Sequence, residues 1–174
     1  EQSAMTYELR DTIVAIATPP GRGALGIVRL SGPAALPVAD RIFASSAGAP
    51  SGFASHTVHY GSVRDGDALL DNVLLTVMRA PKTYTGEDVV EISCHGGPLV
   101  LRSVLHAALR AGARPAAPGE FTLRAFLNGK MDLAQAEAVQ QLIAAESEAA
   151  MRLALRHLAG DLSRAVEDFR HRLV

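Results

Sequence analysis

The chain of 174 residues contains little cysteine, the residue with which small proteins form disulfide bonds or bind structural metal ions. It contains one cysteine, Cys94, and no tryptophan. A single cysteine excludes an internal disulfide bond and a zinc site built from several cysteines, and it is typical of a reducing compartment. We therefore expect a cytoplasmic protein that is stabilised by a hydrophobic core, for which this length is sufficient.

Strong charge of either sign and long apolar runs are also missing. The 17 basic and 18 acidic residues leave a formal net charge of -1, and no basic run is present, so this chain alone lacks the electrostatic signature of a tight nucleic-acid binder. No apolar run approaches the roughly 20 residues of a membrane-spanning helix, and the first residues do not resemble a signal peptide. We expect no membrane association, and we expect residues 1–4, before Met5, to be left over from cloning.

The first two thirds of the chain mix strand and helix patterns. β-branched runs predict strands, Arg64-Asp65-Gly66-Asp67 predicts a hairpin turn, and Pro98 is well placed as the first residue of a helix. The predicted strands cover residues 12–17, 25–30, 56–63, 73–78 and 88–94, and the predicted helices run from about 33 to 44 and from 98 to about 111.

The last third has a helical pattern only. Apolar residues repeat with a helical period from Leu133 to Leu158, and Gly160-Asp161 predicts the end of this helix and the start of another. The apolar face of that last helix carries Leu162, Val166, Phe169 and Leu173. We expect an α+β fold, with a mixed-sheet domain over residues 11–125 and the beginning of an all-α domain over 126–174 whose apolar face lacks its partner.

A lysine stands directly before the most strongly capped of these helices. Asp132 and Gln135 have the spacing of a capping box, and Asn128-Gly129 supplies a turn before them. Lys130, one of only two lysines against fifteen arginines, is therefore expected at an exposed and well-defined position where a ligand can meet it.

Three glycines match a nucleotide-binding pattern, but their context argues against such a site. Gly21, Gly23 and Gly26 fit G-x-G-x-x-G after a strand, whereas the dinucleotide fingerprint requires a helix to follow, and here the strand-like run Ile27-Val28-Arg29-Leu30 follows. No Lys-Ser or Lys-Thr completes a P-loop. We expect no GTP or ATP site in this chain.

Cys94 and His95 resemble a nucleophile and its base only superficially. Neighbours on a strand point to opposite faces, so we interpret Cys94 as a small buried residue. His95 before two glycines either lines a site or fixes the end of the strand, and the sequence does not separate these alternatives. The other histidines show no metal-ligand spacing, and no metal site is expected. They are His56, His59, His106, His157 and His171.

Two ionic residues interrupt apolar strands. Arg29 lies between Val28 and Leu30, and Glu91 lies between Val90 and Ile92. One interpretation is that they are solvated or form an ion pair with each other. The other is that they converge with Lys130 on a pocket, where a carboxylate accepts N–H donors from a planar heterocycle and the cations meet its oxygens or a carboxylate tail.

Three long motifs in the same order carry a family resemblance. DTIVAIATPPGRGALGIVRLSGP, TYTGEDVVEISCHGGP and PGEFTLRAFLNGKMDLAQAEAV together resemble the N-terminal part of the MnmE (TrmE) family of tRNA-modification GTPases, over residues 11 to about 165. The resemblance implies a fold like the folate-binding domain of the glycine-cleavage T-protein. It also implies a homodimer that binds a tetrahydrofolate derivative, 5-formyl- or 5,10-methylene-tetrahydrofolate, followed by a helical domain.

The motifs also carry the family's folate contacts to Arg29, Glu91 and Lys130. Of these, Glu91 suits the amino-pyrimidine edge of the pterin, because that edge presents adjacent N–H donors. The resemblance further implies a MnmG-type flavin protein and tRNA as partners, in 5-carboxymethylaminomethyl-type modification of the wobble uridine. GTP, Mg²⁺ and K⁺ belong to the family's GTPase domain, whose motifs this chain lacks, so we expect no GTP hydrolysis and no catalytic residue here. The alternatives are a structural dimerisation module without ligand binding and a stand-alone folate-dependent aminomethyltransferase.

Overall fold

A computed structural model of the protein describes residues 11–161 and 163–164, which fall into two units, one ending at Pro118 and one beginning at Gly119. The division comes earlier in the chain than the boundary at 125/126 expected from sequence. Residues 1–4 and most of the last expected helix, with Leu162, Val166, Phe169 and Leu173, lie outside the described residues.

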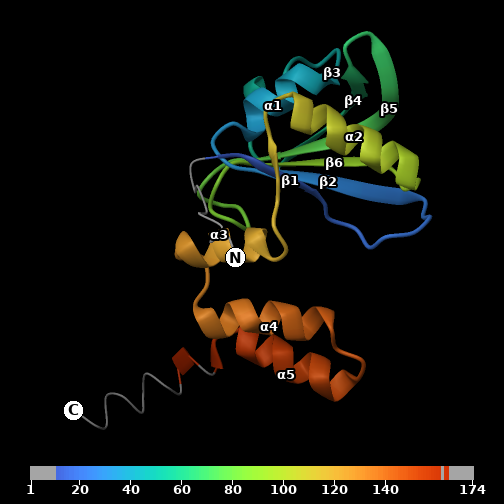
Figure 1. The fold of residues 1–174 in the computed structure, drawn as a ribbon. Helices are drawn as coiled ribbons and strands as arrows, with labels where there is room; N and C mark the ends of the chain where they lie inside the picture. Colours follow the sequence, from blue (N-terminus) through green and yellow to red (C-terminus); the bar gives the residue numbers. More distant parts are fainter. Residues whose placement is uncertain (1–10, 162, 165–174) are drawn as a thin grey trace, which may run out of the picture. The chain divides into compact units, whose positions relative to one another are not determined.

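The first unit is built on one mixed sheet of seven strands, in the order β3-β4-β5-β6-β2-β1-β7 (Figure 1). The strands are β1 (Ile13–Ile16), β2 (Leu25–Ser31), β3 (Phe43–Ala44), β4 (Thr57–Asp65), β5 (Ala68–Met78), β6 (Val89–His95) and β7 (Arg114–Pro115). All neighbours pair antiparallel except β1 and β7, which are parallel. Pro115 is tolerated in β7 because this strand lies at the edge of the sheet, where a missing N–H breaks no ladder.

Two helices cover one face of this sheet. They are α1 (Ala35–Ile42) and α2 (Pro98–Arg110), which lie side by side in Figure 1. Their buried side chains, among them Leu36, Ala39, Val104 and Ala108, join Ile92 and other strand residues in one hydrophobic core. The 3-10 turn η1 (Pro50–Gly52) packs beside α1.

Alternation along the strands decides which residues reach this core. In β6, Val90, Ile92 and Cys94 are buried in the core, whereas Glu91 and Ser93 are half-buried. Because successive side chains of a strand point to opposite faces, Glu91 and Ser93 lie on the face that carries neither α1 nor α2. We call this the helix-free face.

The predicted strands and the hairpin of the first unit are confirmed, with small shifts at their ends. The first helix stops at Ile42 rather than near residue 44, because Phe43 turns to an extended conformation and pairs with Val63. The hairpin turn contains Gly66 at φ +57°, and β5 begins earlier than predicted, at Ala68.

The second unit contains α3 (Glu120–Leu127), α4 (Leu133–Ile143) and α5 (Glu148–Leu158). Helix α3 was not predicted from sequence, and the prediction of a single helix from Leu133 to Leu158 is wrong, since the helix ends at Ile143. Ser147 starts the next helix by accepting a hydrogen bond from the Ala150 N–H. The two pieces fold back on each other, and the Gln135 side chain donates to the Leu158 carbonyl at 2.8 Å. Across the described ranges, no helix is long and apolar enough to cross a bilayer.

Candidate ligand site

Arg29 and Glu91 form an ion pair across two neighbouring strands. They are direct register partners in the β2/β6 ladder, and Arg29 Nε donates to Glu91 Oε1 at 2.7 Å, with Nη2 2.6 Å from the same oxygen. Their side chains are 29% and 22% exposed. The pair is therefore neither buried nor fully solvated, and the sequence interpretation as an ion pair is confirmed.

The surroundings of the pair include an aromatic ring. The centroid of the Tyr84 ring lies 6.0 Å from Arg29 Cζ, which is the outer limit of a cation–π contact. Ala15 pairs with Arg29 on one side and Thr76 pairs with Glu91 on the other, which completes a row of small or polar residues across the helix-free face. Sequence reasoning did not identify Tyr84, although it lies in the second of the three motifs.

One oxygen of the Glu91 carboxylate remains available to a ligand. Both contacts with Arg29 use Oε1, and Oε2 has no hydrogen-bond partner among the residues described. A carboxylate accepts several hydrogen bonds, and those to an ionised acceptor are the strong ones. Chemically, Glu91 is suited to hold adjacent N–H donors of a flat heterocycle, while Arg29 supplies a cation beside it.

Arg29 and Glu91 lie together in the first unit, whereas Lys130 belongs to the second unit. It is exposed and follows Gly129, whose φ of +68° makes the turn after α3. Its backbone N–H donates to the Ala125 carbonyl at 2.8 Å, which fixes the main chain at this point. The expected exposure of Lys130 and its defined backbone position are confirmed.

The predicted capping box after Lys130 is also confirmed. The Asp132 carboxylate accepts from the Gln135 N–H at 2.9 Å, and the Gln135 side chain accepts from the Asp132 N–H at 2.9 Å. Asp132 also accepts a short hydrogen bond from the Ser163 hydroxyl. The bonds from Ser163 and from the Gln135 backbone lower the pKa of Asp132 below its usual value.

His95 fixes the end of β6 through Asp71, a residue that sequence reasoning did not connect with it. Asp71 accepts from the His95 backbone N–H and pairs with Nδ1, both at 2.8 Å. Burial raises the pKa of Asp71, but the hydrogen bonds from His95 and from the Asn72 backbone outweigh this and lower it below 3.8. His95 thus fixes the strand end, and its side chain is 73% exposed.

Cys94 is the small buried residue that the sequence indicated, and the glycine motif is followed by a strand, as expected. Cys94 is 1% exposed, and burial, followed by the charge of Asp71, raises the pKa of its thiol to about 11. The glycines of G-x-G-x-x-G precede or enter strand β2 and not a helix, so the dinucleotide fingerprint is absent. Among the described residues, no group of three or more His, Cys, Asp or Glu side chains is placed to hold a metal ion.

Comparison with known proteins identifies the family. A sequence model described as "GTP-binding protein TrmE N-terminus" matches residues 12–130, a range that includes Arg29, Glu91 and Lys130. The chain belongs to the TrmE N-terminal family. The TrmE assignment agrees with the observed α+β fold and its seven-stranded mixed sheet.

Relatives of this TrmE-family chain carry the name tRNA modification GTPase MnmE. The protein of Chlamydia pneumoniae is 53% identical over 164 residues, and that of Enterococcus faecalis is 53% identical over 166 residues. The protein of Listeria innocua is 52% identical over 164 residues. Each match covers 94% of this chain and 36% of the relative, so the chain spans just over a third of the length of these relatives.

Proposed function

We propose that this chain is the folate-binding and dimerising N-terminal part of a tRNA-modification GTPase. Its ligand is a tetrahydrofolate that carries a one-carbon unit, either 5-formyl- or 5,10-methylene-tetrahydrofolate. Glu91 accepts the N–H donors of the amino-pyrimidine edge, and Arg29 and Lys130 provide cations for the ring oxygen or the glutamate tail. Residues 11–125 form the folate-binding domain in this proposal, and residues 126–174 begin the helical domain.

The observation that carries the proposal is the half-exposed Arg29–Glu91 pair. A purely structural ion pair gains most when both carboxylate oxygens are used, whereas here Oε2 has no partner among the described residues. The pair also lies on a sheet face that neither α1 nor α2 covers. A ligand can therefore reach the carboxylate without displacing a helix.

The rest of the activity belongs to the whole protein. The names of the relatives support a role in tRNA modification by a GTPase. We propose that the full-length protein acts on the wobble uridine in 5-carboxymethylaminomethyl-type modification, with tRNA and a MnmG-type flavin protein as partners in the cytoplasm. GTP, Mg²⁺ and K⁺ are expected to bind in the GTPase domain and not in this chain.

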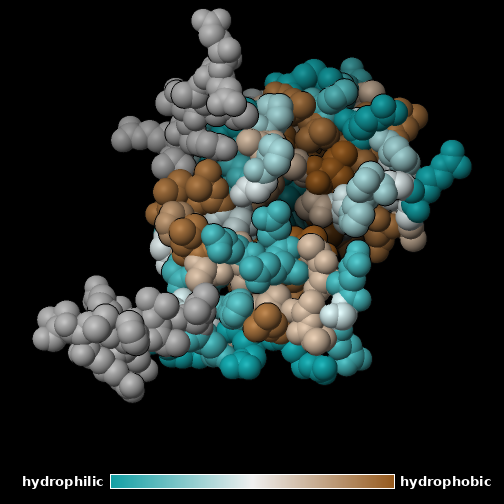
Figure 2. All heavy atoms as spheres, turned by 60° about the horizontal axis from the view of Figure 1, so that its bottom comes forward, coloured by the Kyte–Doolittle hydropathy of each residue, from teal (hydrophilic) through white to brown (hydrophobic). Residues whose placement is uncertain are grey.

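Dimerisation is supported by apolar side chains on the helix-free face. Val58, Tyr60 and Leu74 are 58%, 69% and 49% exposed, and Tyr60 and Leu74 are register partners. On the side of the molecule that Figure 2 shows, apolar side chains gather in patches between polar ones. A second copy that covers such a surface removes it from water, which favours association.

Calorimetry with 5-formyl-tetrahydrofolate tests the ligand, and sedimentation of the same samples tests the dimer. Saturable binding by a dimer supports the proposal, and Leu74→Glu is expected to shift the sedimentation equilibrium toward monomer. A dimer that gives no heat of binding favours the alternative of a structural module. Aminomethyl transfer catalysed by this chain alone favours the alternative of a stand-alone aminomethyltransferase.

A further inference from the structure

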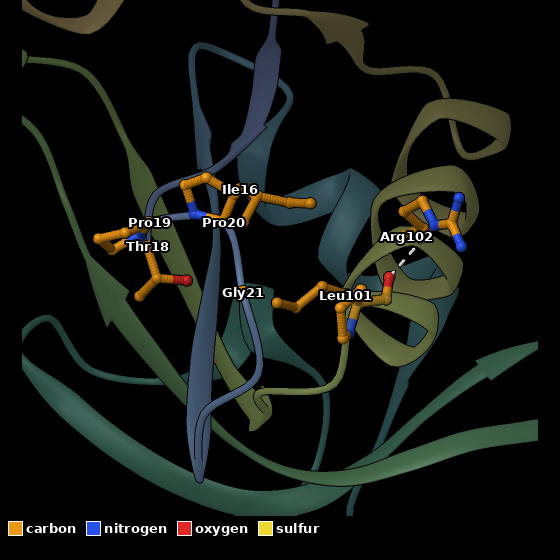
Figure 3. A pocket seen from close by; sticks show the side chains of 8 residues that line it. Ile16, Thr18, Pro19, Pro20, Gly21, Leu101 and Arg102 are labelled. Atoms are coloured by element: carbon orange, nitrogen blue, oxygen red, sulfur yellow. Dashed lines mark hydrogen bonds between the residues drawn. The ribbon is translucent and has the colours of Figure 1, made fainter.

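The first unit has a pocket that the proposed folate contacts do not use. It has a volume of about 510 Å³ and lies between the Thr18–Gly21 loop and the first turns of α2 (Figure 3). Pro19, Pro20, Pro98 and Leu101 give it mainly apolar walls. This volume lies within the range of small-molecule sites, and a mainly apolar lining with a few polar groups is typical of them.

The pocket and the Arg29–Glu91 pair lie on opposite faces of the sheet. Leu101, which lines the pocket, belongs to α2 and to the hydrophobic core that this helix shares with Val28 and Leu30. Arg29 stands between these two strand residues and therefore points to the helix-free face. A ligand in the pocket and a ligand on Glu91 consequently occupy separate sites.

The loop that carries the glycine motif forms one wall of this pocket, through Gly21. The Gly23 N–H donates to the Gly96 carbonyl at 3.1 Å, and the Gly96 N–H donates to the Ala24 carbonyl at 3.2 Å. The Thr18 hydroxyl oxygen accepts from the Ile27 N–H at 3.3 Å. These hydrogen bonds connect the loop to the ends of β2 and β6, so the pocket is preformed in the absence of a ligand.

The charge around the hollow has one sign. Arg102 lines the pocket, and Arg22 lines a smaller hollow of about 280 Å³ that shares the same loop. Within the described residues, no aspartate or glutamate lines either hollow and neither arginine has an acidic partner. Arg102 Nε donates to the Pro98 carbonyl at 3.3 Å, drawn as a dashed line in Figure 3.

Other arginines of the chain contrast with these two. Arg110, at the far end of the same helix α2, is paired with Asp65 through Nη2 at 2.5 Å. An unpaired guanidinium keeps its fork of donors for a carboxylate or a phosphate, which it binds with two parallel hydrogen bonds. One such group at this apolar hollow, with a second at the adjoining one, favours a ligand that has both an anionic group and an apolar body.

We propose that this pocket binds a small molecule with a flat apolar body and one anionic group, either a carboxylate or a phosphate. The body lies between the proline loop and Leu101, Arg102 binds the anion at this pocket, and Arg22 adds positive charge at the adjoining hollow. This site is independent of the folate proposal, because its residues lie on the other face of the sheet.

Amide NMR spectra of the chain, titrated with phenyl phosphate and with benzoate, test the site. Benzyl alcohol and inorganic phosphate are the controls that lack the anion and the apolar body, respectively. We expect saturable shifts of the Gly21, Leu101 and Arg102 amides, which line the pocket, with at least one anionic probe. The probe that binds more tightly shows whether the site prefers phosphate or carboxylate. Arg102→Gln is expected to weaken this binding about ten-fold or more, because it removes a charged hydrogen-bond donor.

Two further variants test whether probe binding is specific to this pocket. Arg110→Gln removes an arginine from the same helix, and Glu91→Gln alters the proposed folate site, so both are expected to leave probe binding unchanged. The proposal is overturned if neither anionic probe gives saturable shifts, if benzyl alcohol or inorganic phosphate binds as tightly, or if Arg102→Gln binds like the unaltered chain. Because Arg102 is exposed, its replacement is expected to leave the fold intact, which the same spectra check.

Discussion

The backbone of Gly96 lies so close to that of Gly23 that no side chain fits between them. A Cβ atom at Gly96 would lie 2.6 Å from the carbonyl oxygens of both Gly23 and Leu25. The Gly23 N–H donates to the Gly96 carbonyl at 3.1 Å. This contact joins the glycine loop to the end of β6 and so positions the wall of the pocket beside α2.

Gly96→Ala is therefore expected to destabilise the first unit. The added methyl group meets backbone atoms that have little room to move, and overpacking of this kind costs about 1–3 kcal/mol. Gly97→Ala is the matched control, because its Cβ would meet nothing nearer than 3.9 Å. Chemical denaturation of both variants measures the difference, and equal free energies of unfolding would contradict the account of this contact.

The Asp71–His95 pair is expected to give an acid-dependent contribution to stability. The pKa of Asp71 is lowered in the folded chain. The ionised carboxylate therefore stabilises the fold at pH values above 3.8, the usual pKa of an aspartate. That contribution is lost in the acid window that begins near the usual value of 3.8 and ends below the lowered folded pKa. Asp71→Asn is expected to lose less stability than the unaltered chain across this window.

The control for this pH dependence is Asp67→Asn, in the exposed turn of the same hairpin. It is expected to follow the unaltered chain, because Asp67 does not contact His95. Free energies of unfolding measured at several pH values test both variants. An Asp71→Asn curve that runs parallel to that of the unaltered chain would show that the pair does not link protonation to folding.

Cys94 is expected to be inert toward thiol reagents in the folded chain. With the pKa of its thiol raised to about 11, only about one thiol in a thousand is ionised at pH 8, and the side chain is buried. A colorimetric thiol assay should therefore detect no rapid reaction until denaturant is added, and one reacting thiol per chain afterwards. Rapid reaction without denaturant would place Cys94 outside the core.

Asp132→Ala is expected to weaken the start of α4. The substitution removes the bond to the Gln135 N–H and the short bond from Ser163, and loss of an N-cap costs about 1 kcal/mol. Asp132→Asn keeps a side-chain acceptor and is expected to lose less. Helix content followed during thermal unfolding compares the two variants, and equal losses would mean that the charge rather than the cap stabilises this helix.

Alternation and turn chemistry made most of the first unit predictable. The run Val89–Cys94 combines β-branched residues with one ionic residue, Glu91, which predicts a strand with one buried and one accessible face. The structure has β6 at Val89–His95 with Glu91 on the accessible face. The ion pair with Arg29 was one of two alternatives, because spacing within a strand does not determine its register against a neighbour.

The features that the sequence did not predict are the break before α5, helix α3 and the Asp71–His95 contact. They depend on contacts between segments that are distant in sequence or on weak local signals. The helical period of the apolar residues spans residues 144–147, so periodicity alone did not reveal the break at which Ser147 caps α5. The N-terminal end of α3 follows Gly119 at φ +75°, and Glu120 pairs with Arg124 while both are buried. The Asp71–His95 contact joins different strands, and no spacing rule predicts it.

Calorimetry with 5-formyl-tetrahydrofolate on Glu91→Gln tests the central claim most directly. The variant keeps the shape of the side chain but loses its charge, and we expect a loss of roughly 1.5–3 kcal/mol, which is ten-fold or more in affinity. Asp65→Asn, which breaks the Arg110–Asp65 pair elsewhere in the first unit, is the control and is expected to bind like the unaltered chain. No binding by a folded dimer, or equal affinity of Glu91→Gln and the unaltered chain, would contradict a folate site at Glu91.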